Sequence, residues 1–207
     1  RQTGKQVDSN TAANLMQSAV NSANSAIYQV ANEQEQCAGM GTTLVLSLFV
    51  DNQVVIGHIG DSRAYLLRND QLLQLTNDHS LLQEQIDSGL LTPEQAKQAT
   101  YKNFVTKALG VDPEADLEIN THTVAIGDLY LLCSDGLTDM VDDYEIETTL
   151  IEHYDDLESL ANALIRKANQ RGGKDNISVI LISVVEGFPI NRPNWLQSLV
   201  KKVMDKG

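Results

Sequence analysis

Three aspartates stand at the ends of predicted β-strands, each beside a glycine or another small residue. Asp61 follows the apolar run VVIGHIG, Asp135 follows LYLLCS, and Asp175 precedes NISVILI. In an antiparallel sandwich these strand ends can share one edge, where each unpaired, desolvated carboxylate is unfavourable by several kcal/mol. A divalent cation is the natural counter-charge, and an all-oxygen ligand set suits Mg²⁺ or Mn²⁺ better than Zn²⁺. The pattern therefore indicates a candidate metal site.

Each aspartate also has a structural interpretation when it is taken alone. Asp135 could cap a helix that starts near Leu137. Asp61 could lie in a turn and pair with Arg63, and Asp175 could be an ordinary loop residue before a strand. For each residue by itself the structural role is favoured, and only the coincidence of three such positions makes metal binding competitive.

The other candidates for chemistry have simpler interpretations. His79 in NDHS can act as a general acid or a pH-sensitive group. We favour a structural role as a hinge at the start of the segment 79–99. His58 lies inside a predicted strand and is expected to be packed there. Cys133 has no neighbour in the sequence that would activate it, so an unreactive core thiol is expected.

Helices and hairpin strands alternate around these residues. The apolar periodicity predicts a helix from Asn10 to about Gln36, capped by Asn10 or Thr11. Short turns between β-branched runs predict an antiparallel meander of four strands, and later strands and helices follow. The ranges are strands 41–50, 54–60, 62–68 and 71–76, two short helices within 79–99, strands 117–125 and 128–134, helices 144–152 and 156–173, and a strand 176–185.

Hairpin connections favour antiparallel pairing, so the predicted fold class is α+β, an antiparallel β-sandwich with helices on its outer faces. The composition shifts after Glu186 towards Pro and Lys. We therefore expect one domain over residues 1–186 and a tail over 187–207 that carries a short amphipathic helix around Trp195.

The net charge of the chain limits the classes of partner that it can bind. The 207 residues include 28 acidic and 15 basic side chains, for a net charge of −13. Nucleic acid and anionic membrane surfaces require basic patches, so neither is expected as a partner. A phosphorylated substrate would also be repelled unless cations lay between it and the protein. The two cysteines have no CxxC spacing, and no membrane span or signal pattern is visible, so we expect a cytoplasmic protein.

Six segments resemble, in order and spacing, motifs of the protein phosphatase 2C (PPM) family of metal-dependent serine/threonine phosphatases. The resemblance spans about residues 10–186, and the short form looks bacterial. It implies a central β-sandwich between helix layers (αββα), with a helical flap at about 79–103 that includes His79 and Ser80 beside the substrate. The segments are GMGTT (39–43), GDSRAY (60–65), LTNDHS (75–80), VTKALG (105–110), LLCSDGLTD (131–139) and GGKDNISVI (172–180).

The resemblance also implies a metal centre and a mechanism. Asp135 and Asp175 would be ligands of a core centre of two Mn²⁺ or Mg²⁺ ions. Asp61 and Asp135 would hold a third, weaker ion, and Asp139 would support it directly or through water. A metal-activated water would attack the phosphorus directly, and no catalytic residue beyond the metal ligands is expected.

One part of the family pattern has no equivalent in this sequence. Members normally carry, ahead of the first helix, an acidic residue, a phosphate-binding Arg and an ADGMGG-type motif whose Asp bridges both metals. Because the chain does not begin with Met, we expect this segment to lie ahead of Arg1. In the alternative, the chain is a catalytically inactive, phosphatase-like domain that binds a partner. The expected substrates are proteins phosphorylated on Ser or Thr by a kinase, and the expected state is a monomer.

Overall fold

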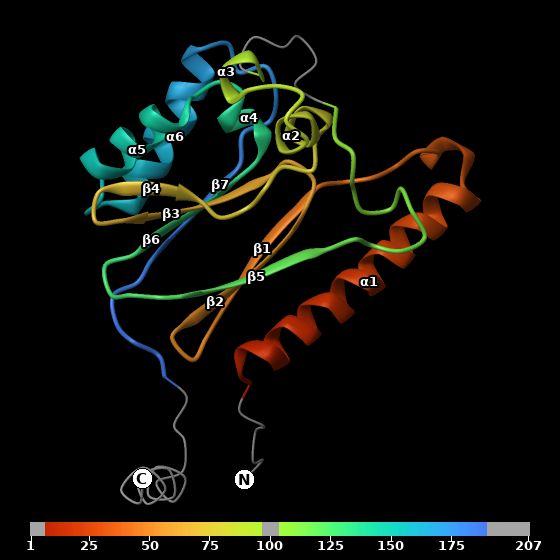
Figure 1. Cartoon of the computed structure of the whole chain (residues 1–207), viewed down its shortest axis with the longest axis horizontal. Helices are drawn as coiled ribbons and strands as arrows, with labels where there is room; N and C mark the ends of the chain where they lie inside the picture. Colours follow the sequence, from red (N-terminus) through yellow and green to blue (C-terminus); the bar gives the residue numbers. More distant parts are fainter. Residues whose placement is uncertain (1–6, 97–103, 190–207) are drawn as a thin grey trace, which may run out of the picture.

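Two antiparallel sheets face each other in the computed structural model, which describes residues 7–96 and 104–189 (Figure 1). One sheet has the order β1-β2-β5 and the other the order β4-β3-β6-β7. This is the predicted α+β sandwich. The strands are β1 (Leu44–Val50), β2 (Gln53–Ile59), β3 (Arg63–Arg68), β4 (Gln71–Gln74), β5 (Glu118–Thr123), β6 (Leu129–Cys133) and β7 (Val179–Ser183).

A helix layer covers the outer face of each sheet (Figure 1). Helix α1 (Ser9–Glu33) packs on the β1-β2-β5 sheet, while α4 (Asp135–Thr138), α5 (Asp143–Glu152) and α6 (Leu157–Gln170) pack on the other. Neighbouring strand residues point to opposite faces. On β3, Ala64 therefore belongs to the cluster between the sheets, and Tyr65 to the cluster under α5 and α6. This double burial explains why the strands are apolar on both faces.

The chain changes sheets between β2 and β3, so the prediction of one four-stranded meander was wrong. Strands β1 and β2 pair with each other, and so do β3 and β4. The second neighbour of β2 is β5, however, and the second neighbour of β3 is β6. The crossing occurs at Gly60, whose φ is +103°. A Cβ on Gly60 would lie 2.4 Å from Cγ2 of Thr43, so the corner also requires the missing side chain.

The first helix begins earlier than predicted. Its N-cap is Asp8, whose Oδ1 accepts a hydrogen bond from the backbone N–H of Thr11 at 2.8 Å, so neither Asn10 nor Thr11 is the cap. The helix ends at Glu33, and a short 3₁₀ helix, η1 (Glu35–Cys37), follows it. All three candidate caps have side chains that accept such a bond, so composition alone does not select between them.

The predicted flap contains α2 (Leu81–Asp87) and α3 (Pro93–Ala96). Ser80 caps α2 by accepting a hydrogen bond from the Gln83 N–H, as expected for a helix that begins there. Residues 97–103 of the flap and the predicted helix around Trp195 lie outside the described residues. Within the described part, no helix has the length and apolar character needed to cross a membrane.

Candidate metal centre

The strand register brings the predicted acids to one edge of the β4-β3-β6-β7 sheet. Arg63, at the start of β3, lies opposite Cys133, at the end of β6, and Val179, at the start of β7, lies opposite the same cysteine. Asp61 comes just before β3, and Asp135 just after β6. Because these neighbouring strands are antiparallel, the two aspartates must leave the sheet at the same edge.

The loop that carries Asp175 is fastened to the segment that carries Asp135. Ser134 Oγ donates to the Asn176 carbonyl at 3.1 Å and accepts from the Ser178 N–H at 3.0 Å. A Cβ on Gly136 would lie 2.4 Å from the Asn176 oxygen, so only glycine allows this approach. The small residues beside the acids are therefore required for close packing between two loops.

The structure excludes two of the simpler interpretations. Ser134 is the N-cap of α4, and Asp135 is the first residue within the helix, so Asp135 is not a helix cap. Arg63 donates to both carboxylate oxygens of Asp78, at 2.8 and 2.7 Å, and so is not the partner of Asp61. Asp175 keeps a loop role as well, because its Oδ1 accepts the Asn176 N–H at 2.7 Å.

All four predicted metal ligands line one cavity of about 920 Å³. They are Asp61, Asp135, Asp139 and Asp175. The base of the flap lines the same cavity through Ser80 and residues of α2. His79 is not among the described residues that line it. The fold therefore brings the four predicted ligands and Ser80 to one cavity, but not His79.

Burial and neighbouring carboxylates raise the pKa of two aspartates in this cavity, Asp61 and Asp135. Burial, and next the charge of Asp135, raise the pKa of Asp61 to about 6. Burial, followed by the charges of Asp139 and Asp175, also raises the pKa of Asp135. Among the described residues, no Lys or Arg forms an ion pair with any of these four aspartates. Asp61 and Asp135 are partly buried, whereas Asp139 and Asp175 are exposed. Carboxylate oxygens gathered without a basic partner fit a hard divalent cation.

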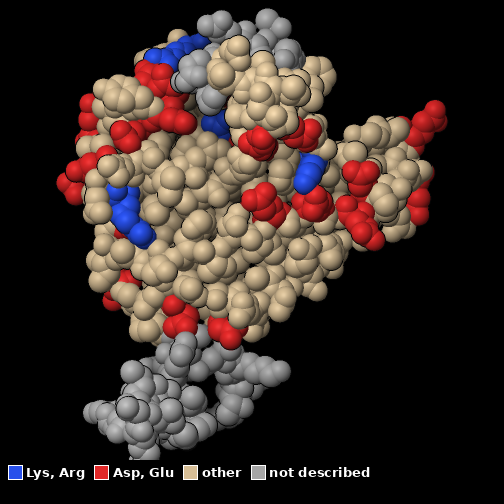
Figure 2. All heavy atoms as spheres, viewed as in Figure 1, with Lys and Arg blue, Asp and Glu red and all other residues tan. Residues whose placement is uncertain are grey.

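Two of the three basic residues described in the cavity lining form ion pairs with other acids. Arg63 is bound to Asp78, and Arg171 donates to both carboxylate oxygens of Glu145. On the face seen in Figure 2, Asp and Glu gather over the end of the molecule that carries α5 and α6, with few Lys or Arg among them. Lys174 also lines the cavity, but no ion pair joins it, or any other Lys or Arg of the described part, to these aspartates.

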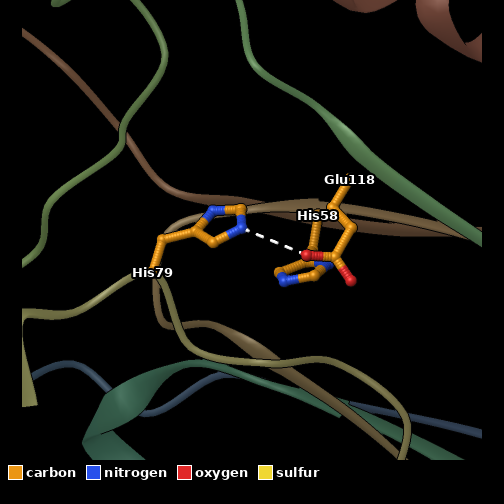
Figure 3. Close-up of side chains that lie close together, drawn as sticks. All are labelled: His58, His79 and Glu118. Carbon is orange, nitrogen blue, oxygen red and sulfur yellow. Dashed lines mark ion pairs between the residues drawn. The ribbon is translucent and has the colours of Figure 1, made fainter. Parts of the chain in front are cut away.

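A second group of potential ligands consists of His58, His79 and Glu118 (Figure 3). One donor atom of each residue lies within 4.8 Å of the others, whereas no three of the four aspartates meet this distance within the described chain. The two imidazole rings are stacked, with centroids 4.6 Å apart and planes 20° from parallel. Nitrogen lone pairs lie in the ring plane, so stacked rings do not direct them towards one ion. Sequence spacing gave no sign of this pair, although the packed position expected for His58 is confirmed.

The chain matches a family model described as protein phosphatase 2C over residues 2–181. It is 42% identical over 169 residues to the serine/threonine phosphatase stp of Listeria innocua, which covers 81% of this chain and 66% of that protein. The solved structure of the Streptococcus agalactiae serine/threonine phosphatase superposes with a TM-score of 0.81 and 33% identity, over 87% of this chain and 73% of that one. The catalytic domain of the phosphatase PstP, solved with two manganese ions, superposes with a TM-score of 0.76 and 35% identity, over 90% and 74%. The chain thus spans slightly less than two thirds of its Listeria relative.

Proposed function

This chain belongs to the protein phosphatase 2C family, and we propose that it hydrolyses phosphoserine and phosphothreonine in proteins with bound Mn²⁺ or Mg²⁺. The observation that carries this proposal is the cavity with four aspartates and no basic partner for any of them among the described residues. The names of its relatives, and the manganese ions of the PstP structure, support the same activity and cofactor.

The four aspartates have separate proposed roles. Asp135 and Asp175 would hold the core metal centre, while Asp61 and Asp135 would hold a third, weaker ion near Asp139. The causes of the raised pKa values support this division, because the charges of Asp139 and Asp175 raise the pKa of Asp135, and the charge of Asp135 raises that of Asp61. When bound, divalent cations would neutralise phosphate charge and make water a better nucleophile at neutral pH.

The remaining residues of the cavity would shape access and orientation. Arg63 and Asp78 hold each other through two hydrogen bonds on the cavity wall, and Gln74 adds a contact to Asp78 at 3.3 Å. Ser80 fixes the start of α2 at the opening, where the flap would meet a phosphoprotein. We propose protein substrates modified by a Ser/Thr kinase, and a monomeric enzyme.

Manganese-dependent release of phosphate from a phosphothreonine peptide tests the proposal. The assay should use the product of the complete gene, since this chain spans 66% of its Listeria relative. We expect Asp135→Asn and Asp175→Asn to lose activity by about 100-fold or more, because each removes a charged ligand from the centre. Asp155→Asn is the matched control, an exposed acid outside the cavity, and should keep full activity.

Two outcomes would argue against the enzyme. Full activity in either Asp135→Asn or Asp175→Asn would refute the metal assignment. Calorimetric titration with Mn²⁺ separates the second case. If the wild type binds the metal but releases no phosphate from any phosphopeptide, the inactive, partner-binding alternative is supported instead.

A further inference from the structure

Two hydrogen bonds join His79 to Gly60. The backbone N–H of His79 donates to the Gly60 carbonyl at 2.9 Å, and the Gly60 N–H donates to Nδ1 of the His79 ring at 3.2 Å. Gly60 directly precedes Asp61, and His79 directly precedes Ser80, the N-cap of α2. These two hydrogen bonds therefore link the Gly60 corner, which precedes Asp61, to the base of the flap.

The hydrogen bonds define which nitrogen of each ring carries a proton. His79 Nδ1 accepts a hydrogen bond from the Gly60 amide, so the ring's own proton must be on Nε2, which lies 3.5 Å from Glu118 Oε2 (Figure 3). His58 Nε2 lies 2.7 Å from the Asn77 carbonyl, which can only accept, so His58 also carries its proton on Nε2. This geometry requires neutral His79.

A second proton on His79 would break the one of these two hydrogen bonds that the ring accepts, and leave the backbone bond alone to hold Gly60. Protonated Nδ1 would place an N–H donor against the Gly60 N–H, and the new charge would lie in a ring stacked on His58 at 4.6 Å. Burial, then the neighbouring His58 on β2 and Lys107, lower the pKa of His79, while Glu118 on β5 opposes them. Lys107 is in turn paired with Asp116 at 2.5 Å. These are the titratable and charged groups that face His79 from the packed segments.

We propose that the stacked His58–His79 pair is a proton-sensitive clamp, which holds the Gly60 corner to the flap base while His79 is neutral and releases it in acid. His79 acts as a positioning residue for Asp61 and Ser80. The clamp concerns the fold of the chain, so it stands whether or not the chain hydrolyses phosphate.

The sign of the pH dependence follows from the lowered pKa. The unfolded chain, with a histidine pKa near 6.5, binds more protons than the folded chain just below that pH. The stabilisation from neutral His79 is therefore complete above about pH 6.5. It is lost progressively as the pH falls below that value.

Two substitutions separate the acceptor from the titrating ring. In His79→Asn, the amide oxygen can take the place of Nδ1 and accept the Gly60 N–H, but it does not titrate. In His79→Gln, the amide reaches the place of Nε2 instead, so the Gly60 N–H has no acceptor. The readout is the hydrogen-exchange protection factor of the Gly60 amide, measured in EDTA at pH 7.5 and 5.0.

We expect wild-type protection at Gly60 to fall by about tenfold or more between pH 7.5 and 5.0, one decade per pH unit of linked protonation. The Leu75 amide, which donates to the Ala64 carbonyl at 2.8 Å, is the reference and should stay protected. His79→Asn should keep Gly60 protected at both pH values, and His79→Gln should leave it unprotected at both. Equal pH dependence in wild type and His79→Asn, or wild-type protection in His79→Gln, would overturn the clamp.

A measurement on the unmodified chain covers the case in which a variant does not fold. Nitrogen-15 shifts of the His79 ring should show an unprotonated Nδ1 and a protonated Nε2 at pH 7.5. In acid, both nitrogens should become protonated as the Gly60 amide shift changes. A proton on Nδ1 at pH 7.5, or ring protonation without any change at Gly60, refutes the proposal.

Discussion

Aspartates lie at both ends of the β3–β6 strand pair, but only those at one end have a basic partner in the described structure. At one end, Asp61 and Asp135 meet in a cavity with no basic partner in the described structure. At the other end, Asp128 is 1% exposed and accepts hydrogen bonds from Arg68 at 2.7 and 2.6 Å. It also accepts the Ala125 N–H at 2.8 Å. Within the described part, the chain thus supplies a basic partner for buried Asp128 and none for the partly buried Asp61 and Asp135.

The pKa values record this difference. Burial and neighbouring carboxylates raise the pKa of Asp61 to about 6. Burial acts on Asp128 in the same direction, but the hydrogen bonds from Arg68 and Ala125 outweigh it and lower that pKa. A buried acid with a basic partner stabilises the fold, and a partly buried acid without one marks a position where the fold tolerates a cost. The comparison predicts opposite effects when the two kinds of acid are replaced.

Removing the paired acid should have the largest effect on stability. Asp128→Ala leaves Arg68, the Ala125 N–H and the Tyr130 hydroxyl without their acceptor, so we expect the free energy of unfolding to fall by about 3–5 kcal/mol. Urea denaturation at pH 7.5 measures it. Asp128→Asn, which keeps an acceptor oxygen, should lose less.

The matched control is the exposed Lys107–Asp116 pair, with Asp116 76% exposed. Asp116→Ala should change the free energy of unfolding by less than about 1 kcal/mol. If Asp128→Ala were as mild as Asp116→Ala, the contrast between the two strand ends would be lost.

Packing between the loops at the unpaired end should give the next largest effect. Gly136→Ala directs a Cβ at the Asn176 carbonyl, so the loop that carries Asp175 must move. We expect a loss of about 1–3 kcal/mol in the free energy of unfolding, together with weaker Mn²⁺ binding by calorimetry. Gly187→Ala, whose Cβ would lie 3.3 Å from the nearest atom, should be milder in stability and neutral in metal binding. Unchanged metal affinity in Gly136→Ala would show that this close approach does not position the acids.

Much of the fold could be predicted because each element has its own local signal. Apolar runs between turn residues predicted each of the seven strands in the described part of the chain. The acids at the strand ends could be placed together because antiparallel neighbours must share an edge. The change of sheet at Gly60 could not be predicted in the same way. A hairpin and a crossing between sheets have similar turn residues, and their difference depends on contacts with distant residues such as Thr43.

The side-chain partners of the site were harder to predict than its location. Arg63 is close to Asp61 in the sequence, yet it binds Asp78, which the β3–β4 hairpin brings back beside it. His58 and His79 were considered separately because stacking requires a strand and a loop to meet in three dimensions. Sequence proximity is a poor guide to pairing when side chains are long or lie in loops.

The smallest effect is the one most specific to the unpaired acids. Asp61 has a pKa of about 6 in the folded chain, against an ordinary value of 3.8, so the folded chain binds more protons between these values. Metal-free stability should therefore fall as the pH rises from about 4 to 6 and stay low above that range. Asp61→Asn removes this charge, and in EDTA at pH 7.5 it should raise the free energy of unfolding by about 1–2 kcal/mol. The gain should vanish near pH 4, where the wild-type carboxyl is protonated in both states.

Saturating Mn²⁺ should favour the wild type instead, while Asp155→Asn should follow the wild type throughout. If Asp61→Asn were less stable than wild type in EDTA, Asp61 would have an internal partner, and the two ends of the strand pair would no longer differ in kind.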